Sequence, residues 1–138
     1  MISKVFIDTN VFVALKDDTD STHEKALKLL KILIEQKTSL FTSSDIIAES
    51  LTVISRKLGK DEAMEFLKEL KTYAKEIFID ESIHAETRKF FAKVKSKNIS
   101  FIDCSSVIAM KRNKIKYIFS FDEDFKKMGV ELLADAVK

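Results

Sequence analysis

The chain has 138 residues, of which 46% are hydrophobic, and this length and composition fit one domain, residues 1–138, with its own core. The 24 basic and 22 acidic residues leave a net charge of +2, so net charge alone does not indicate a nucleic-acid binder. The single cysteine excludes an intramolecular disulfide, and no signal peptide or long apolar segment is present. We therefore expect a cytoplasmic protein that makes no use of a membrane.

Strand-like and helical patterns alternate along the first half of the chain. Short apolar runs predict strands, and apolar residues at helical spacing predict helices. The predicted elements are a strand at residues 4–7, a helix at 22–37, a strand at 40–42, a helix at 44–58 that ends at Gly59, and a helix at 61–74. The first strand stops at Asp8-Thr9-Asn10, residues that terminate strands and cap helices.

The second half of the chain continues the alternation. The predicted elements are a strand at residues 77–79, a helix marked by apolar positions at 83–94, a helix opened by Asp103, a strand at 117–121 and a short strand at 130–133. Strands that alternate with helices imply parallel strands joined by helical crossovers. We therefore predict an α/β fold of three layers, in which helices cover both faces of a mostly parallel sheet.

Acidic residues stand where ligands bind in such folds, at the carboxyl ends of the strands. Asp8 ends the first predicted strand, Asp122 ends the strand at 117–121, and Asp103 opens a helix. Glu49 lies at the margin of the apolar stripe of its helix, which would hold it against the sheet. Clustered carboxylates repel one another unless a cation compensates their charge, and a set of oxygen ligands favours Mg²⁺ or Mn²⁺. Each residue alone also fits a structural role, the aspartates as helix caps and Glu49 as a solvated helix residue.

Three short motifs resemble those of PIN-domain ribonucleases. They are Val-Phe-Ile-Asp-Thr-Asn-Val-Phe-Val at residues 5–13, Phe-Ile-Asp at 101–103 and Ile-Phe-Ser-Phe-Asp-Glu-Asp-Phe at 118–125, with Ser-Asp-Ile-Ile-Ala-Glu at 44–49 between them. Their order and spacing also match, so the resemblance covers nearly the whole chain. Cys104-Ser105-Ser106 departs from the family pattern, in which small apolar residues follow the aspartate.

The resemblance implies a fold, a site and an activity. It implies a PIN-like fold with a metal-centred quartet of Asp8, Glu49, Asp103 and Asp122, with Asp124 as an auxiliary acid and metal ligand, and with Asn10 and Ser120 as supporting polar residues. The implied activity is Mg²⁺- or Mn²⁺-dependent hydrolysis of RNA. The size is similar to that of VapC-type toxins of toxin–antitoxin pairs, which implies a homodimer and an antitoxin protein as partners.

Basic residues lie between the last two acidic motifs. Lys111, Arg112, Lys114 and Lys116 are candidates for binding RNA phosphates, although such a run is more often a solvated helix end. Two other functions compete with a nuclease. A phosphatase with Asp8 as nucleophile would want a second acid at position 10, where this chain has Asn10. A PIN-like nuclease of RNA processing or decay, or a module that binds RNA without cleaving it, would keep the same fold.

Overall fold

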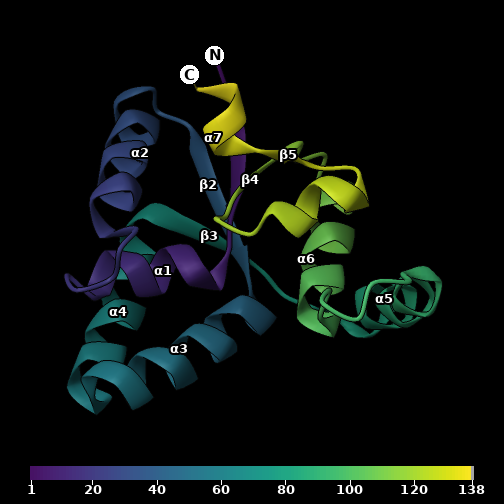
Figure 1. Ribbon diagram of the computed structural model, residues 1–138, viewed down its shortest axis with the longest axis horizontal. Helices are drawn as coiled ribbons and strands as arrows, with labels where there is room; N and C mark the ends of the chain where they lie inside the picture. Colours follow the sequence, from purple (N-terminus) through teal and green to yellow (C-terminus); the bar gives the residue numbers. More distant parts are fainter. Residues whose placement is uncertain (138) are drawn as a thin grey trace.

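The computed structural model describes residues 1–137, which contain a five-stranded parallel sheet (Figure 1). The strands are β1 (Lys4–Ile7), β2 (Ser39–Ser43), β3 (Ala74–Ile77), β4 (Tyr117–Phe119) and β5 (Glu131–Leu132). Their order across the sheet is β3-β2-β1-β4-β5, and each neighbouring pair is parallel. The chain therefore first moves from β1 outward to β3, then returns across the sheet to β4 beside β1.

Helices cover both faces of this sheet. They are α1 (Thr9–Lys16), α2 (His23–Glu35), α3 (Ser44–Leu58), α4 (Lys60–Tyr73), α5 (Glu81–Lys93) and α6 (Phe101–Arg112), with the short η1 (Glu123–Met128) and α7 (Leu133–Ala136) flanking β5. In Figure 1, α1, α2 and α4 lie on one side of the strands, and α5 and α6 lie on the other. A right-handed crossover puts its helices on one face of the sheet when the chain moves in one direction and on the other face when it moves back. The chain moves from β1 to β3 and then back to β4, so the two groups of helices lie on opposite faces. The predicted three-layer α/β fold is confirmed.

The core lies on both sides of β1, the central strand. Val5, Phe6 and Ile7 are fully buried. Phe12 of α1 meets Phe66 of α4 edge to face, with ring centroids 5.1 Å apart, and this contact ties two helices of one layer together. No helix in residues 1–137 combines the length and the apolar character needed to cross a membrane.

The structure corrects the boundary of the third strand. The predicted strand at 77–79 is wrong, because β3 spans Ala74–Ile77 and its register pairs Ala74 with Leu40 and Ile77 with Ser43 of β2. The strand thus begins immediately where α4 ends. Phe78 lies beyond the paired segment, and its side chain is 69% exposed.

Two corrections affect the acidic residues directly. β4 ends at Phe119 rather than at residue 121, because the backbone N–H groups of Phe121 and Asp122 bond to side chains instead of to a neighbouring strand. Helix α6 begins at Phe101 with Ser100 as its N-cap, so Asp103 is the third residue of the helix and not the first. Three helices were not predicted: α1 and η1, which follow β1 and β4 and begin beside the predicted site, and α7, which begins at Leu133 directly after β5.

Candidate active site

A cleft opens at the carboxyl ends of β1 and β4. From these adjacent strands the chain departs in opposite directions, from β1 toward β2 and from β4 toward β5, and such a divergence leaves a crevice at the sheet edge. The cleft has a volume of about 410 Å³. Its lining residues are Asp8, Thr9, Asn10, Val13, Asp20, Glu49, Val53, Lys57, Asp103 and Asp122. The four predicted acids, which come from four different segments, therefore share one cleft.

Asp8 lies deepest among these acids. It caps α1, and its Oδ1 accepts a hydrogen bond from the Thr9 backbone N–H at 2.9 Å. Its Oδ2 accepts a hydrogen bond from the Ser120 hydroxyl at 2.7 Å, across from the end of β4. Only 6% of the residue is exposed. Both carboxylate oxygens are therefore held in fixed directions at the floor of the cleft.

The Ser120 hydroxyl connects Asp8 to the loop that carries Asp122. Its oxygen accepts hydrogen bonds from Asn10 Nδ2 and from the Asp122 backbone N–H, each at 3.1 Å. Both lone pairs of the hydroxyl are thereby used, so its hydrogen is committed to Asp8. Asn10 Oδ1 accepts from the Phe121 N–H at 3.2 Å, which fixes the same loop a second time. Asn10 and Ser120 thus join the start of α1 to the loop that follows β4.

The other three acids are also oriented by local bonds. Asp103 forms a capping box with Ser100, in which its Oδ2 accepts from the Ser100 N–H at 2.9 Å. Asp122 caps η1 by accepting from the Asp124 N–H at 2.9 Å. Glu49 accepts a hydrogen bond from the Thr9 hydroxyl, across from α1. Asp8 and Asp122 are thus the N-caps considered for them, whereas Asp103 bonds back to the N-cap Ser100 from the third position of α6, and these bonds fix the direction of each carboxylate.

Burial and mutual repulsion disfavour the charged forms of two acids. Burial, together with the negative charges of Asp103 and Glu49, raises the pKa of Asp8 to about 7, although the bonds from Ser120 and Thr9 counteract part of this increase. Burial also raises the pKa of Asp103, and the charges of Asp122 and Glu49 add to that effect. Near neutral pH the cleft therefore holds more negative charge than Lys57, the one cation among its described lining residues, balances.

The donor atoms fit a hard divalent cation that keeps part of its water shell. The aspartates and the glutamate that line the cleft offer carboxylate oxygens, the ligand type that Mg²⁺ and Mn²⁺ prefer. Within residues 1–137, no three acidic, histidine or cysteine side chains already converge as a complete set of direct ligands. Mg²⁺ usually binds only one or two carboxylates directly and retains several waters, so such convergence is not required. Asp8 and Asp103, the two acids whose pKa values are raised, are the candidates to hold such a cation.

Asp124 lies outside the lining of this cleft. Its carboxylate pairs with Lys127 at 2.9 Å within the short η1 helix, while its backbone N–H serves Asp122. It supports Asp122 through the backbone, and its role as a metal ligand stays a prediction.

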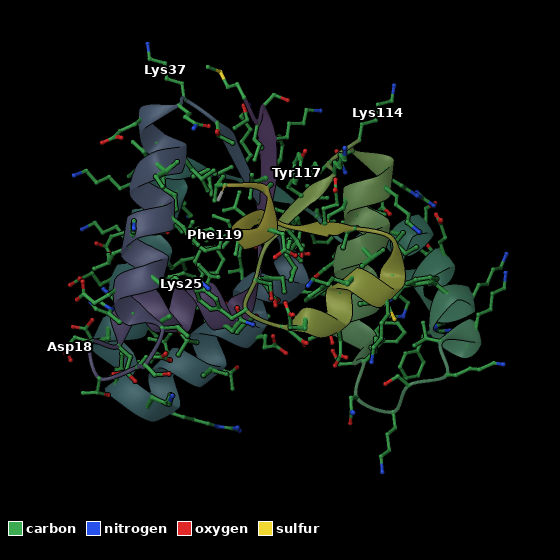
Figure 2. The ribbon with its side chains drawn as sticks, turned by 45° about the horizontal axis from the view of Figure 1, so that its top comes forward. Asp18, Lys25, Lys37, Lys114, Tyr117 and Phe119 are labelled. Carbon is green, nitrogen blue, oxygen red and sulfur yellow. The ribbon has the colours of Figure 1, made fainter. Side chains whose placement is uncertain are left out.

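The structure does not bring the predicted basic residues to the cleft. Asp103 stands in the first turn of α6, whereas Lys111 and Arg112 stand in its last turn, about 12 Å further along the helix at about 1.5 Å per residue. Lys114 follows at the same end, which Figure 2 shows on the opposite side of the molecule from the loop at Asp18. Lys116 precedes β4, and its ammonium pairs with Glu131 at 3.1 Å. These four cations thus lie at or beyond the carboxyl end of α6, away from Asp103 in its first turn.

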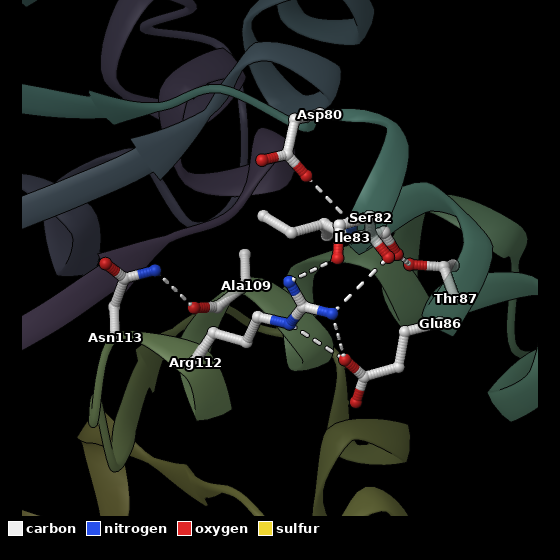
Figure 3. A network of polar contacts seen from close by, with 8 residues as sticks. All are labelled: Asp80, Ser82, Ile83, Glu86, Thr87, Ala109, Arg112 and Asn113. Carbon is white, nitrogen blue, oxygen red and sulfur yellow. Dashed lines mark hydrogen bonds and ion pairs between the residues drawn. The ribbon is translucent and has the colours of Figure 1, made fainter.

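Arg112 has a structural role instead. Its guanidinium pairs with Glu86 at 2.6 Å and donates to the Ser82 hydroxyl at 2.9 Å, so it joins α6 to α5 (Figure 3). The prediction that it contacts RNA near the acids is therefore not supported by its position.

Sequence reasoning missed several residues of the cleft. Thr9 directly follows Asp8, and its hydroxyl orients Glu49. Helix α1 was not predicted, but a hydroxyl residue in its first turn, next to Asp8, could have indicated that Thr9 belongs to the cleft. Val53 and Lys57 follow Glu49 at four-residue spacing, so they share its helix face. Asp20 lies in the loop between α1 and α2, and no pattern in the sequence places it here.

The unusual segment after Asp103 is accommodated in the interior. Cys104, Ser105 and Ser106 are all fully buried. The Ser105 hydroxyl donates to Asp45 at 2.8 Å, which links α6 to the start of α3 beneath the cleft. Burial raises the pKa of the Cys104 thiol, so this side chain is not a thiolate nucleophile at neutral pH.

Comparisons with known proteins give the family and the fold of this chain. The family model of the PIN domain matches residues 5–131. Ribonuclease VapC1 of Aquifex aeolicus is 30% identical over 132 residues, which cover 94% of this chain and 89% of the relative. The 23S rRNA-specific endonuclease VapC20 of Mycobacterium tuberculosis is 23% identical over 91% of this chain and 94% of its own.

Solved structures show the same fold. The crystal structure of Mycobacterium tuberculosis VapC20, described as a toxin that cleaves the sarcin-ricin loop, superposes with a TM-score of 0.80 over 91% of this chain and 95% of that chain. VapBC2 from Rickettsia felis, solved with a DNA fragment from its promoter, gives a TM-score of 0.67 at 14% identity, over 94% of this chain and 96% of that chain.

The raised pKa of Asp8 predicts how stability depends on pH in the metal-free protein. The folded-state pKa of about 7 lies above the ordinary value of 3.8, so the protonated form is favoured by folding. This contribution to stability is complete below about pH 4 and is lost as the pH rises through about 7. Asp8→Asn lacks this titration. The unfolding free energy of wild type, relative to Asp8→Asn, should therefore fall by a few kcal/mol between pH 4 and pH 8.

Urea unfolding in EDTA at several pH values measures this difference. The variant also disturbs the bond from Ser120, but that cost does not depend on pH and cancels in the comparison. Parallel pH profiles for the two proteins would show that Asp8 is not perturbed.

Proposed function

This chain belongs to the PIN domain family, and we propose that it is a Mg²⁺- or Mn²⁺-dependent ribonuclease that acts as the toxin of a toxin–antitoxin pair. One observation carries the activity: four oriented carboxylates share a cleft whose deepest member, Asp8, is buried and has its pKa raised to about 7. A protein keeps such a costly arrangement when a divalent cation and its chemistry require it.

The residues divide the work of phosphodiester hydrolysis. Asp8 and Asp103 would hold the cation, and Ser120 and Asn10 keep Asp8 aligned with the loop of Asp122. A bound Mg²⁺ or Mn²⁺ would lower the pKa of its water and stabilise negative charge on the phosphate. Glu49, oriented by the Thr9 hydroxyl, and Asp122 would accept hydrogen bonds from the attacking water, and Glu49 would take its proton as the bond between phosphorus and the leaving oxygen breaks. Ser120 and Asn10 thus align Asp8, whereas Glu49 takes up the proton.

The relatives support the choice of RNA and the toxin role. The two sequence relatives described above are named as a ribonuclease and as an rRNA-specific endonuclease, and each matches this chain nearly end to end. VapBC2, a solved structure of the same fold, was determined with a DNA fragment from its promoter, and we propose a comparable antitoxin partner for this chain. We also propose a homodimer and a cytoplasmic location. An adjacent small reading frame whose product binds this protein and inhibits it would test the toxin role.

The first test is RNA cleavage. The purified protein should cleave single-stranded RNA in Mg²⁺ or Mn²⁺ and should stop in EDTA, because carboxylates alone do not activate water at neutral pH. Asp8→Asn and Asp103→Asn should each lose at least about 100-fold in rate, since each removes a carboxylate from the site. Gel analysis of end-labelled RNA measures both effects.

A contaminating nuclease is excluded by purifying all variants in parallel. Lys116→Gln serves as a matched control, because Lys116 forms a surface ion pair with Glu131 before β4, at the amino end of the strand. Full activity in EDTA, or activity retained by both aspartate variants, would refute the proposed chemistry.

The second test links metal binding to stability. Wild type should gain thermal stability as Mn²⁺ rises, following RT ln(1 + [L]/Kd), and Asp103→Asn should gain much less. Asn at this position can still accept the Ser100 N–H, so the capping box is kept while the charge is removed. In EDTA, Asp103→Asn should be as stable as wild type or more so, because repulsion falls, whereas Asp103→Ala should lose about 1 kcal/mol of capping.

Differential scanning calorimetry with and without Mn²⁺ gives all these values. If wild type and Asp103→Asn show the same Mn²⁺-induced rise in melting temperature, Asp103 does not bind the metal.

A further inference from the structure

The cleft continues beyond the acids along one face of α3. Glu49, Val53 and Lys57 follow at four-residue spacing, and all three line the cleft. At about 1.5 Å per residue, Lys57 stands about 12 Å from Glu49 along the helix axis. The cleft is therefore elongated, with the acids around Glu49 at one end, an apolar side chain between, and the Lys57 ammonium, which lies near Asp17 and Asp20, at the other end.

Lys57 differs in charge from its surroundings. Five carboxylates line the cleft, those of Asp8, Asp20, Glu49, Asp103 and Asp122, and Lys57 is the one cation among the lining residues of the described chain, 1–137. A polyanionic substrate that approaches the acids meets repulsion from them. An ammonium at the end of the same cleft supplies attraction that does not depend on the metal.

The Lys57 ammonium is not locked into a structural ion pair. Its partner is Asp17 Oδ2 at 3.8 Å, and 52% of the lysine side chain is exposed. The other oxygen of Asp17 already accepts from the Thr19 hydroxyl at 2.6 Å and from the Thr19 N–H at 3.0 Å, so this carboxylate keeps its place without Lys57. Asp17 is largely buried, but the separation is long and the ammonium end is half exposed, so the pair contributes only about 1 kcal/mol to stability. The ammonium is therefore available to a stronger anion.

We propose that Lys57 binds a backbone phosphate of the RNA next to the scissile one, so that the strand runs along α3 across Val53. This inference rests on the proposed ribonuclease function and adds the path of the substrate. Phosphate contacts fix the position of a strand without reading its sequence. Lys57 thus sets which linkage of the bound strand lies over the carboxylates, and it is a positioning residue.

The test uses RNA in which one phosphate near the cleavage site is replaced by a neutral methylphosphonate. A set of such substrates moves the neutral linkage one position at a time, and each is matched to an oligonucleotide with the same sugar and an ordinary phosphate. For wild type, kcat/KM should fall roughly tenfold when one particular flanking linkage is neutral. Lys57→Gln should lose roughly tenfold on ordinary RNA and show no further loss at that linkage.

Two further variants separate phosphate binding from a general effect on the fold. Lys57→Arg should keep both the rate and the sensitivity to the neutral linkage, because it keeps the charge. Lys116→Gln should behave as wild type. The slope of log(kcat/KM) against log salt should be smaller by about one for Lys57→Gln only.

The outcomes distinguish this inference from the function on which it rests. If wild type cleaves no RNA, the proposed function fails, and the phosphate subsite fails with it. If wild type cleaves RNA but Lys57→Gln keeps the full loss at the same linkage, the function stands and the subsite is refuted. A uniform loss across all substrates, without rescue by Lys57→Arg, would assign Lys57 to the fold alone.

Discussion

Parallel pairing of β1 with β4 is the contact on which the site depends. It aligns Ile7 with Phe119, so that the residues that follow each strand meet although Asp8 and Ser120 are 112 positions apart in the chain. The Ser120 hydroxyl then joins Asp8, Asn10 and the backbone of Asp122 in one network. Without this strand pairing, Asp8 and Asp122 would only cap helices on separate segments of the chain.

The same contacts that orient the acids make them costly. Asp8 is buried at the sheet edge, and its neighbours Asp103 and Glu49 carry the same sign of charge, so the pKa of Asp8 rises to about 7. Local hydrogen bonds from Thr9 and Ser120 offset this in part but do not remove it. The cleft is thus rigid and short of positive charge before any ligand arrives, which suits a site whose cation comes from solution.

Much of this arrangement could be predicted from the sequence, for identifiable reasons. Apolar runs that end in aspartate, at Asp8 and after Phe119, located the strand ends, and alternation of elements gave the parallel sheet that brings them together. The sequence did not show which way a helix runs from the site, however. Four basic residues were expected near the acids, but Lys111 and Arg112 lie in the last turn of α6, and Lys114 and Lys116 follow that turn. The boundary of β3 was misplaced because pairing with β2, and not the apolar run at Ile77 to Ile79, decides where the strand begins. The proposed role of Lys57 uses its spacing after Glu49, but it also depends on which face of α3 lines the cleft, and the structure supplies this.

The most direct test is a crystal structure of the protein from crystals grown with Mn²⁺, in which anomalous diffraction locates the metal. Anomalous density in the cleft at the carboxyl ends of β1 and β4, in contact with Asp8, is the predicted result. Density that avoids Asp8 and Asp103 while Mn²⁺ occupies other sites, or a cleft without metal at saturating Mn²⁺, would contradict the claim that these carboxylates exist to hold a divalent cation.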